Sequence, residues 1–356
     1  MNEMGFQPRE PARVCYYMQT HKDPRQIARL VRTIKEGSPS SIILIDHDVS
    51  APPLDRSLFV DLSDIHFIGT SGGYGDFSHI DRYLAAVDWL DDHGIQFDWL
   101  QNLTGQDYPL RPIADIEQAF AVGGFDGYMQ YAPVFPERTP PDADWGAGPA
   151  YRLCTPFDSA MRFDYSHRRF GMPSTLKQRL LRPFMVVNYV QSWFTVSLAF
   201  SSAGWRRKTT IFNDDFILYG GSFFCTLSAS CVRYARDFAA EHPDIVNYFR
   251  TMAGPDELFL QTVLVNSGKF RISHLGTHYV YFPGGRYNHP KTLGTDDLPK
   301  MLASGAHWAR KFDSGTEVLD ALDLQVRPTW PDSAPGSFGH VQLPEADSLD
   351  AGMLRA

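Results

Sequence analysis

Side chains that could bind a polar ligand follow an apolar run near residue 100. The segment FDWLQNLTGQDYPLRP, residues 97–112, passes from a strand-like stretch into Gly105, Gln106 and Asp107, and two prolines follow. A turn needs only Gly or Pro. The additional amide and carboxylate therefore indicate an edge that meets a ligand.

Two more carboxylates end another apolar run. In IILIDHDVS, Asp46 and Asp48 stand one residue apart. Such a pair could hold a divalent ion such as Mn²⁺ through oxygen ligands, as the D-x-D of many nucleotide-sugar transferases does. The same carboxylates could instead grip a ribose or a base, or form a solvated strand end, because D-x-D is common by chance.

A second acidic pair lies in GPDELFLQTVL, where Asp256 and Glu257 are predicted to occupy the first turn of a helix. Acids at a helix N-terminus interact favourably with the helix dipole and need no further function. A Glu held over a cleft is also a suitable general base for a sugar hydroxyl. The residues alone leave both interpretations open.

Cations gather near the C-terminal end of the chain. Arg310 and Lys311 are adjacent in HWARKFD, and GGRYNHPKTL adds Arg286 and Lys291. Such residues are usually surface charge. Arg as a bidentate donor and Lys as a point charge could also neutralise a diphosphate leaving group without a metal.

The elements that must position these residues alternate between strand and helix patterns. Apolar runs predict strands, and periodic apolar positions predict helices that end at Gly37 and Gly94. This alternation predicts an α/β fold, with a mostly parallel central sheet and helices on both faces. In the first part of the chain, up to about residue 112, the predicted strands are 14–20, 41–46, 58–62, 65–68 and 97–103, and the predicted helices are 23–37 and 77–94.

Ligands of such sheets bind beyond the carboxyl ends of the strands. Residues 20–22, 46–48 and 104–107 are therefore expected along one crevice, with His21 among them. In the second half we predict a strand over 216–221, helices over 228–242 and 254–268, and one or two strands over 270–282.

The segment from 134 to 210 shows no regular pattern. Its basic part, Arg168 to Arg182, is interpreted as a solvated face, with an acidic acceptor as the alternative. Core packing is the expectation for four aromatic residues that could otherwise stack on a sugar ring. These are Trp193, Trp205, Tyr281 and Tyr287.

Composition excludes several classes of protein. The chain has 356 residues, 43% of them hydrophobic, and a formal charge of −8, which argues against nucleic acid as a partner and against general binding to anionic membranes. No signal peptide and no membrane span is recognised, so a cytoplasmic location is expected. Four cysteines without zinc spacing, and the absence of P-loop and GxSxG motifs, indicate no metal-thiolate, P-loop or serine-hydrolase site.

In their order along the chain, the motifs resemble the core 2/I-branching β-1,6-N-acetylglucosaminyltransferases and peptide O-xylosyltransferases, which form glycosyltransferase family 14. The resemblance extends from about Val14 to Asp313. The GQDYPL, PDE and ARKFD blocks contribute most to it. The segments that carry it are YYMQTHKDPRQIARLV, ILIDHDVSAPP, GGYGDFSHIDRYLAAVDWL, FDWLQNLTGQDYPLRP, YGGSFFCTLSASCVRYA, GPDELFLQTVLVNSGKFR and HWARKFD.

The resemblance implies a GT-A-like (Rossmann-like) fold and an inverting transfer of a sugar, GlcNAc or xylose, from a UDP-linked donor to a hydroxyl. It implies no metal cofactor. The catalytic base of the family falls on Glu257. The donor contacts are then expected at His21, Asp48, Gln106, Asp107, Arg310 and Lys311, and further donor or acceptor contacts at Asp256, Ser222, Arg286 and Lys291.

The sequence departs from the family pattern in places. Ser222 stands where the xylosyltransferases carry an Asp, and Tyr74-Gly75 replaces a Trp-Gly pair. Animal members carry a membrane anchor and disulfides, whereas the features of this chain resemble those of a prokaryotic, cytoplasmic enzyme. The acceptor is expected to be a glycan or a small molecule.

We expect one GT-A-like domain over residues 1–325. Its nucleotide-binding half spans about 14–132 and its acceptor and catalytic half about 186–325, with a loose tail over 326–356. Two alternatives remain. One is a metal-dependent transferase that uses Asp46 and Asp48, and the other is a non-catalytic module that binds a nucleotide or a glycan.

Overall fold

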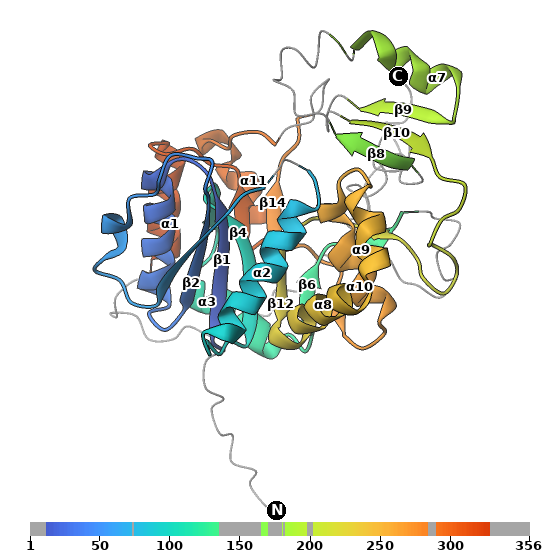
Figure 1. Ribbon diagram of the computed structural model, residues 1–356. Helices are drawn as coiled ribbons and strands as arrows, with labels where there is room; N and C mark the ends of the chain where they lie inside the picture. Colours follow the sequence, from blue (N-terminus) through green and yellow to red (C-terminus); the bar gives the residue numbers. More distant parts are fainter. Residues whose placement is uncertain are drawn as a thin grey trace, which may run out of the picture.

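A seven-stranded, mostly parallel sheet forms the centre of the molecule (Figure 1). The computed structural model describes residues 12–72, 75–134, 165–169, 180, 182–197, 202–283 and 290–327. The strand order is β13-β6-β12-β4-β1-β2-β3, and only β12 runs antiparallel to its neighbours. The strands are β1 Val14–Thr20, β2 Ile42–Asp48, β3 Ile65–Thr70, β4 Trp99–Thr104, β6 Gly127–Met129, β12 Cys225–Ser228 and β13 Ile272–Ser273.

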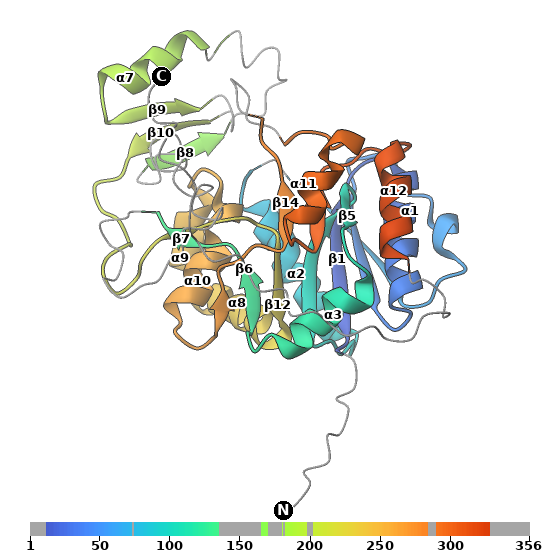
Figure 2. The same cartoon turned by 180° about the vertical axis from the view of Figure 1, so that it is seen from behind.

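Helices cover both faces of this sheet, which confirms the predicted α/β class (Figure 2). Alternate residues of β1 enter different cores: Cys15 and Tyr17 pack on one face, and Tyr16 and Met18 on the other. The first face is covered by α2 Ser78–Asp92, α8 Ala229–Glu241, α9 Pro243–Arg250 and α10 Phe259–Asn266. The second is covered by α1 Pro24–Gly37, α3 Ile113–Val122, α11 Leu298–Ala303 and α12 Glu317–Val326.

Two small sheets join segments that are far apart in the chain. The first has the order β14-β15-β5. In it β15 pairs antiparallel with β5, the short strand that follows β4 in the chain. The second pairs β11 with β7. These strands are β5 Asp107–Pro109, β7 Ala132–Pro133, β11 Tyr219–Gly220, β14 His278–Val280 and β15 Trp308–Arg310.

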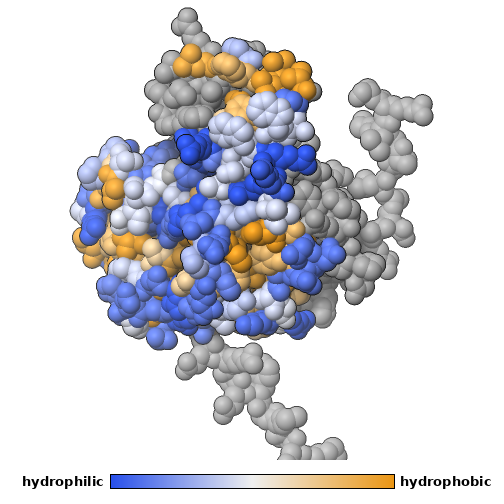
Figure 3. All heavy atoms as spheres, turned by 45° about the vertical axis from the view of Figure 1, so that its right-hand side comes forward, coloured by the Kyte–Doolittle hydropathy of each residue, from blue (hydrophilic) through white to orange (hydrophobic). Residues whose placement is uncertain are grey.

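A three-stranded sheet with a short helix stands away from the central sheet, and we call it the projection (Figure 1). It contacts the rest of the molecule through β8, where the amide of His167 donates to the carbonyl of Thr251 at 2.7 Å. Figure 3 shows hydrophobic atoms at its outer end. It consists of β8 Tyr165–Arg169, η3 Arg182–Val186, α7 Val187–Val190, β9 Phe194–Ser197 and β10 Ser202–Arg206.

The structure corrects several predicted elements. Residues 58–62 form no strand, because the Asp55 carboxylate caps the 3-10 turn η1 Arg56–Phe59 by accepting from the Ser57 amide at 3.0 Å. The predicted strand over 216–221 is limited to β11. Acids 256 and 257 lie in a separate 3-10 turn, η4 Pro255–Glu257, ahead of α10. A last 3-10 turn, η5, spans Thr295–Asp297.

The expectation that the aromatic residues pack in the core is also wrong for three of the four. Trp193 is 61% exposed, Trp205 51% and Tyr281 40%, whereas Tyr287 and the tail beyond 327 lie outside the described residues. Cys15, Cys225 and Cys231 are buried free thiols. No helix in the described ranges has the length and apolar character needed to cross a bilayer.

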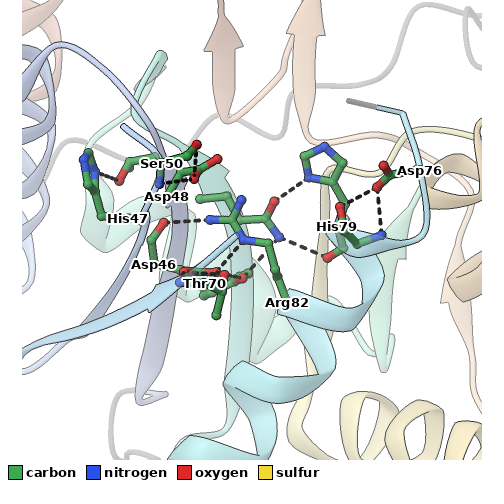
Figure 4. A network of polar contacts seen from close by, with 12 residues as sticks. Asp46, His47, Asp48, Ser50, Thr70, Asp76, His79 and Arg82 are labelled. Carbon is green, nitrogen blue, oxygen red and sulfur yellow. Dashed lines mark hydrogen bonds and ion pairs between the residues drawn. The ribbon is translucent and has the colours of Figure 1, made fainter. Parts of the chain in front are cut away.

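A buried ion pair fastens α2 to the central sheet (Figure 4). The Asp46 carboxylate, at the end of β2, is fully buried and lies 2.8 Å from Nε of Arg82. The hydroxyl of Tyr17 donates to the same carboxylate at 2.9 Å, and the hydroxyl of Thr70 donates to it at 2.8 Å. Three strands and a helix therefore converge on one carboxylate.

Arg82→Met leaves this buried carboxylate without its cation. We expect it to lower the free energy of unfolding by about 3–5 kcal/mol, measured by urea denaturation. Arg250→Met is the matched control. It removes the exposed ion pair between Arg250 of α9 and Asp81 of α2, the helix that also carries Arg82, and should cost about 1 kcal/mol or less. Equal losses in the two variants would contradict the role given to Arg82.

Candidate functional site

The strand ends predicted to form one edge do lie together. Along β1, Gln19 stands opposite both Asp46 of β2 and Thr104 of β4. The hydroxyl of Thr20 lies 2.9 Å from Nδ1 of His47, within hydrogen-bonding distance. The carboxyl ends of three parallel strands therefore share one edge, where ligands of such sheets bind.

An ionised carboxylate stands at this edge. Asp48 is half-buried, and its Oδ1 accepts from the amide of Ser50 at 2.8 Å and from its hydroxyl at 2.7 Å (Figure 4). Burial acts to raise the pKa of Asp48, but these hydrogen bonds, with Arg82 and His21 nearby, lower it overall. Burial and the neighbouring Lys22 lower the pKa of the exposed His21, against the opposing effect of Asp48. Asp48 can therefore accept hydrogen bonds from a polar ligand beside a neutral imidazole.

The pair Asp46 and Asp48 does not fit a Mn²⁺ site. Both oxygens of Asp46 accept hydrogen bonds, and Arg82 is bound to one of them, so a metal there would have to displace the guanidinium. Within the part of the chain that the structure describes, no cluster of three or more His, Cys, Asp or Glu residues could hold a metal ion. Asp46 serves as an anchor for α2.

Arg310 is held on two sides. The antiparallel register of β15 and β5 sets Arg310 opposite Asp107, with Nε 3.3 Å from Oδ1. The guanidinium carbon lies 4.1 Å from the ring centroid of Phe224, a cation–π contact. Asp107 is fully buried, and it also accepts from the hydroxyl of Thr104 at 3.0 Å. Burial raises the pKa of Asp107 although Arg310 opposes this, and the carboxylate faces Arg310, not solvent.

Gln106 connects the same turn to the segment after β15. Its side-chain amide donates to Oδ1 of Asp313 at 3.0 Å, and Nζ of Lys22 lies 3.7 Å from that oxygen. Lys311, the first residue after β15, is half-buried. Gly105 allows the turn to pack closely, because a Cβ there would lie 2.8 Å from Cγ1 of Ile27 in α1.

Glu257 is held by backbone contacts at the end of η4. Its carbonyl accepts from the amide of Gly221 at 2.9 Å, and a Cβ on Gly221 would lie 1.9 Å from the carbonyl oxygen of Gln130, so only glycine fits. Burial and the neighbouring Asp256 raise the pKa of the half-buried Glu257, while Arg310 acts to lower it. Glu257 and Arg310 are therefore close enough to interact electrostatically.

Asp256 is a second carboxylate of the same turn. Burial and the charge of Asp76 raise its pKa, against Arg169. Its Oδ1 is buried and has no hydrogen-bond partner among the residues that the structure describes. Since a buried unpaired oxygen is costly, Asp256 is a candidate acceptor for a ligand hydroxyl.

The remaining predicted contacts are placed differently. Lys291 is bound to Asp297 at 2.8 Å, on an exposed face. The hydroxyl of Ser222 accepts from the amide of Phe224 at 3.2 Å, so it caps the turn that carries Phe224. Arg286 lies outside the described residues.

Sequence reasoning missed four residues at this edge. The rings of Phe224 and His278 are tilted by 37° to one another, with centroids 5.0 Å apart. Burial and nearby Arg310 lower the pKa of His278, which leaves a neutral ring whose Nε2 has no hydrogen-bond partner among the described residues. Nδ1 of His79, on α2, lies 2.6 Å from the side-chain oxygen of Gln19 (Figure 4). Arg82 had a signal, since it is a charged residue on the apolar face of a helix. No local pattern distinguishes the other three.

Comparison with curated proteins identifies distant relatives. The chain is 24% identical over 302 residues to the β-glucuronosyltransferase GlcAT14B of Arabidopsis thaliana, a match that covers 83% of this chain and 59% of the relative. It is 23% identical over 277 residues to GlcAT14A of the same plant, covering 76% and 53%. The chain thus spans between half and three fifths of the length of these relatives. No protein-family model matches.

Among solved structures, similarity is recorded to two 4-diphosphocytidyl-2C-methyl-D-erythritol synthases. One, from Anaerococcus prevotii, is 8% identical with a TM-score of 0.34, and covers 82% of this chain and 96% of that one. The other is 7% identical with a TM-score of 0.35, over 83% and 98%. The sequence relatives support a relationship to glycosyltransferase family 14, and they do not extend to the core 2/I-branching N-acetylglucosaminyltransferases within it.

Proposed function

We propose that this chain is an inverting glycosyltransferase. It transfers a sugar from a nucleotide sugar, UDP-linked, to a hydroxyl of a glycan or small-molecule acceptor. The observation that carries the proposal is Glu257, with its raised pKa, within electrostatic reach of Arg310 at the carboxyl edge of the sheet. The relatives named as glycosyltransferases support it.

Glu257 is the general base in this proposal. Its carboxylate takes the proton of the acceptor hydroxyl as that oxygen forms a bond to the anomeric carbon. The bond from this carbon to the diphosphate breaks on the opposite face, and the nucleoside diphosphate leaves with the electron pair. A raised pKa makes Glu257 a stronger base than an ordinary carboxylate.

Arg310 and Lys311 stabilise the charge that develops on the departing diphosphate. Fixed cations act most strongly where charge grows in the transition state. Asp107 and Phe224 contribute by orienting Arg310. Asp107 forms an ion pair with its Nε, and the ring of Phe224 packs against the face of its guanidinium. In this proposal His21, Asp48 and Gln106 bind the nucleotide side of the donor, and Asp256 and Ser222 make further donor or acceptor contacts. Lys291 is a weaker candidate, since Asp297 holds it.

Three donor sugars are consistent with the proposal. The motif resemblance indicates GlcNAc or xylose, whereas the names of the relatives indicate glucuronic acid. Transfer assays with the three UDP-sugars separate them.

Two alternatives are distinguishable. A metal-dependent transferase would need Asp46, whose carboxylate is occupied by Arg82. A non-catalytic binding module would bind UDP and transfer nothing, and it would have no use for a base at position 257.

Glu257→Gln removes the base and keeps the shape of the side chain. Turnover should fall by at least about 100-fold, while UDP still shifts the thermal unfolding midpoint as in the unmodified protein. Glu241→Gln, at the exposed end of α8, is the control and should be fully active. Normal turnover in Glu257→Gln would exclude this residue as the base.

The pH dependence of kcat/KM tests the same residue independently. A protonated Glu257 cannot accept the hydroxyl proton, so kcat/KM should rise with pH, by about tenfold per unit below its pKa. This acidic limb should lie above the range of an ordinary Glu, because burial and Asp256 raise the pKa of Glu257. Asp256→Asn removes the neighbouring charge and should move the limb to lower pH, and an unmoved limb would argue against the assignment. Asp244→Asn, an exposed acid of α9, serves as control.

Removal of divalent ions should leave transfer essentially unchanged. Asp46 offers no free oxygen to a metal, and the cations Arg310 and Lys311 take the role of neutralising the diphosphate. The assay is initial rate in EDTA against added MnCl₂. Loss of activity in EDTA that Mn²⁺ restores would favour the metal-dependent alternative.

A further inference from the structure

The sequence segment that contains the projection, residues 165–213, differs sharply in charge from the rest of the chain. Residues 165–213 contain no Asp or Glu, although the whole chain carries a formal charge of −8. The remaining residues, with 25 basic and 41 acidic side chains, therefore carry −16. The eight cations of this segment are Arg168, Arg169, Lys177, Arg179, Arg182, Arg206, Arg207 and Lys208.

Exposed apolar side chains gather in the same segment. Fourteen large hydrophobic side chains are exposed in the described part of the chain, and six of them lie between residues 180 and 205. Val190 is 73% exposed and Trp193 61%. Soluble monomers seldom carry such a concentration without a partner for it. The six are Leu180, Phe184, Val186, Val190, Trp193 and Trp205.

The strand register places a cation beside these side chains. Phe194 of β9 stands opposite Trp205 of β10, with ring centroids 4.9 Å apart. Arg168 of β8 stands opposite Ala203, two residues before Trp205, and so shares their face of the sheet. Arg168 is exposed, as is Lys208 just after β10. Helix α7 and β9 form the outer end, away from the central sheet (Figure 1). Hydrophobic residues gather at that end (Figure 3).

We propose that the projection binds the surface of an anionic phospholipid bilayer. Its aliphatic and Trp side chains enter the boundary between headgroups and acyl chains, and its cations contact lipid phosphates. This inference goes beyond the proposed transfer reaction and does not depend on it. The net charge of the whole chain conceals the site, because a membrane surface acts on charges within about 10 Å.

Other occupants explain less of the surface. A solvated face would carry acids among its cations and would not expose Phe184, Val186 and Val190 together. An acidic glycan would use the cations and the Trp rings, but it offers nothing apolar to the aliphatic side chains. A lipid surface uses both kinds of side chain.

The test is flotation of the full chain with vesicles of phosphatidylcholine and phosphatidylglycerol, against vesicles of phosphatidylcholine alone. Binding is expected only to the anionic vesicles, and raised salt should weaken it. Val190→Ser with Trp193→Ser, and separately Arg168→Glu with Lys208→Glu, should each lower the bound-to-free ratio at least tenfold.

Matched controls lie outside the projection. Val60→Ser with Leu324→Ser changes side chains that are 82% and 84% exposed, and Arg25→Glu with Lys300→Glu reverses two exposed cations. Both pairs should leave vesicle binding within twofold, and thermal unfolding checks that every variant folds.

Several results would overturn the proposal. One is an unmodified chain that does not float with anionic vesicles, and another is equal loss of binding in the projection and control variants. A chain that binds soluble heparin but no vesicles would assign the face to an acidic glycan. A dimer that Val190→Ser with Trp193→Ser dissociates, without vesicle binding, would assign it to a second copy.

Discussion

The pairing of β15 with β5 is the constraint on which the candidate site depends. It joins residues about 200 positions apart in the chain and sets Arg310 opposite the buried Asp107. A buried carboxylate needs a partner, and a guanidinium bound on one side by that carboxylate and on one face by Phe224 loses its freedom to point elsewhere. The cation is thus oriented before any ligand arrives.

This placement of Arg310 has a consequence for Glu257. Burial and Asp256 favour the neutral form of Glu257, and Arg310 favours the ionised form. A general base must be ionised to accept a proton yet basic enough to hold it. Arg310 opposes the larger effect of burial and that of Asp256 on the pKa of Glu257, so the proposed base and the proposed leaving-group cation cannot be altered independently.

The role of each charged side chain in this protein depends on where it lies in the fold. Asp46 and Asp48 look equivalent in sequence, yet one anchors Arg82 inside the molecule and the other stands at the strand edge with Ser50. The formal charge of −8 likewise divides into a strongly acidic body and a segment without acids. A sum over the chain hides both distinctions, because electrostatic effects fall off within about a Debye length.

Local pattern determined much of the fold. The apolar runs and periodic helices predicted β1, β2, β4, α1, α2 and α8 and their order, because burial of a strand or of a helix face is recorded in neighbouring residues. The same pattern placed His21, Asp48 and Gln106 at strand ends. Only the tertiary structure decided which carboxylate is buried against Arg82, that Asp107 holds Arg310, and that Trp193 and Trp205 are exposed. These depend on contacts between segments far apart in the chain, and no spacing within one segment records them.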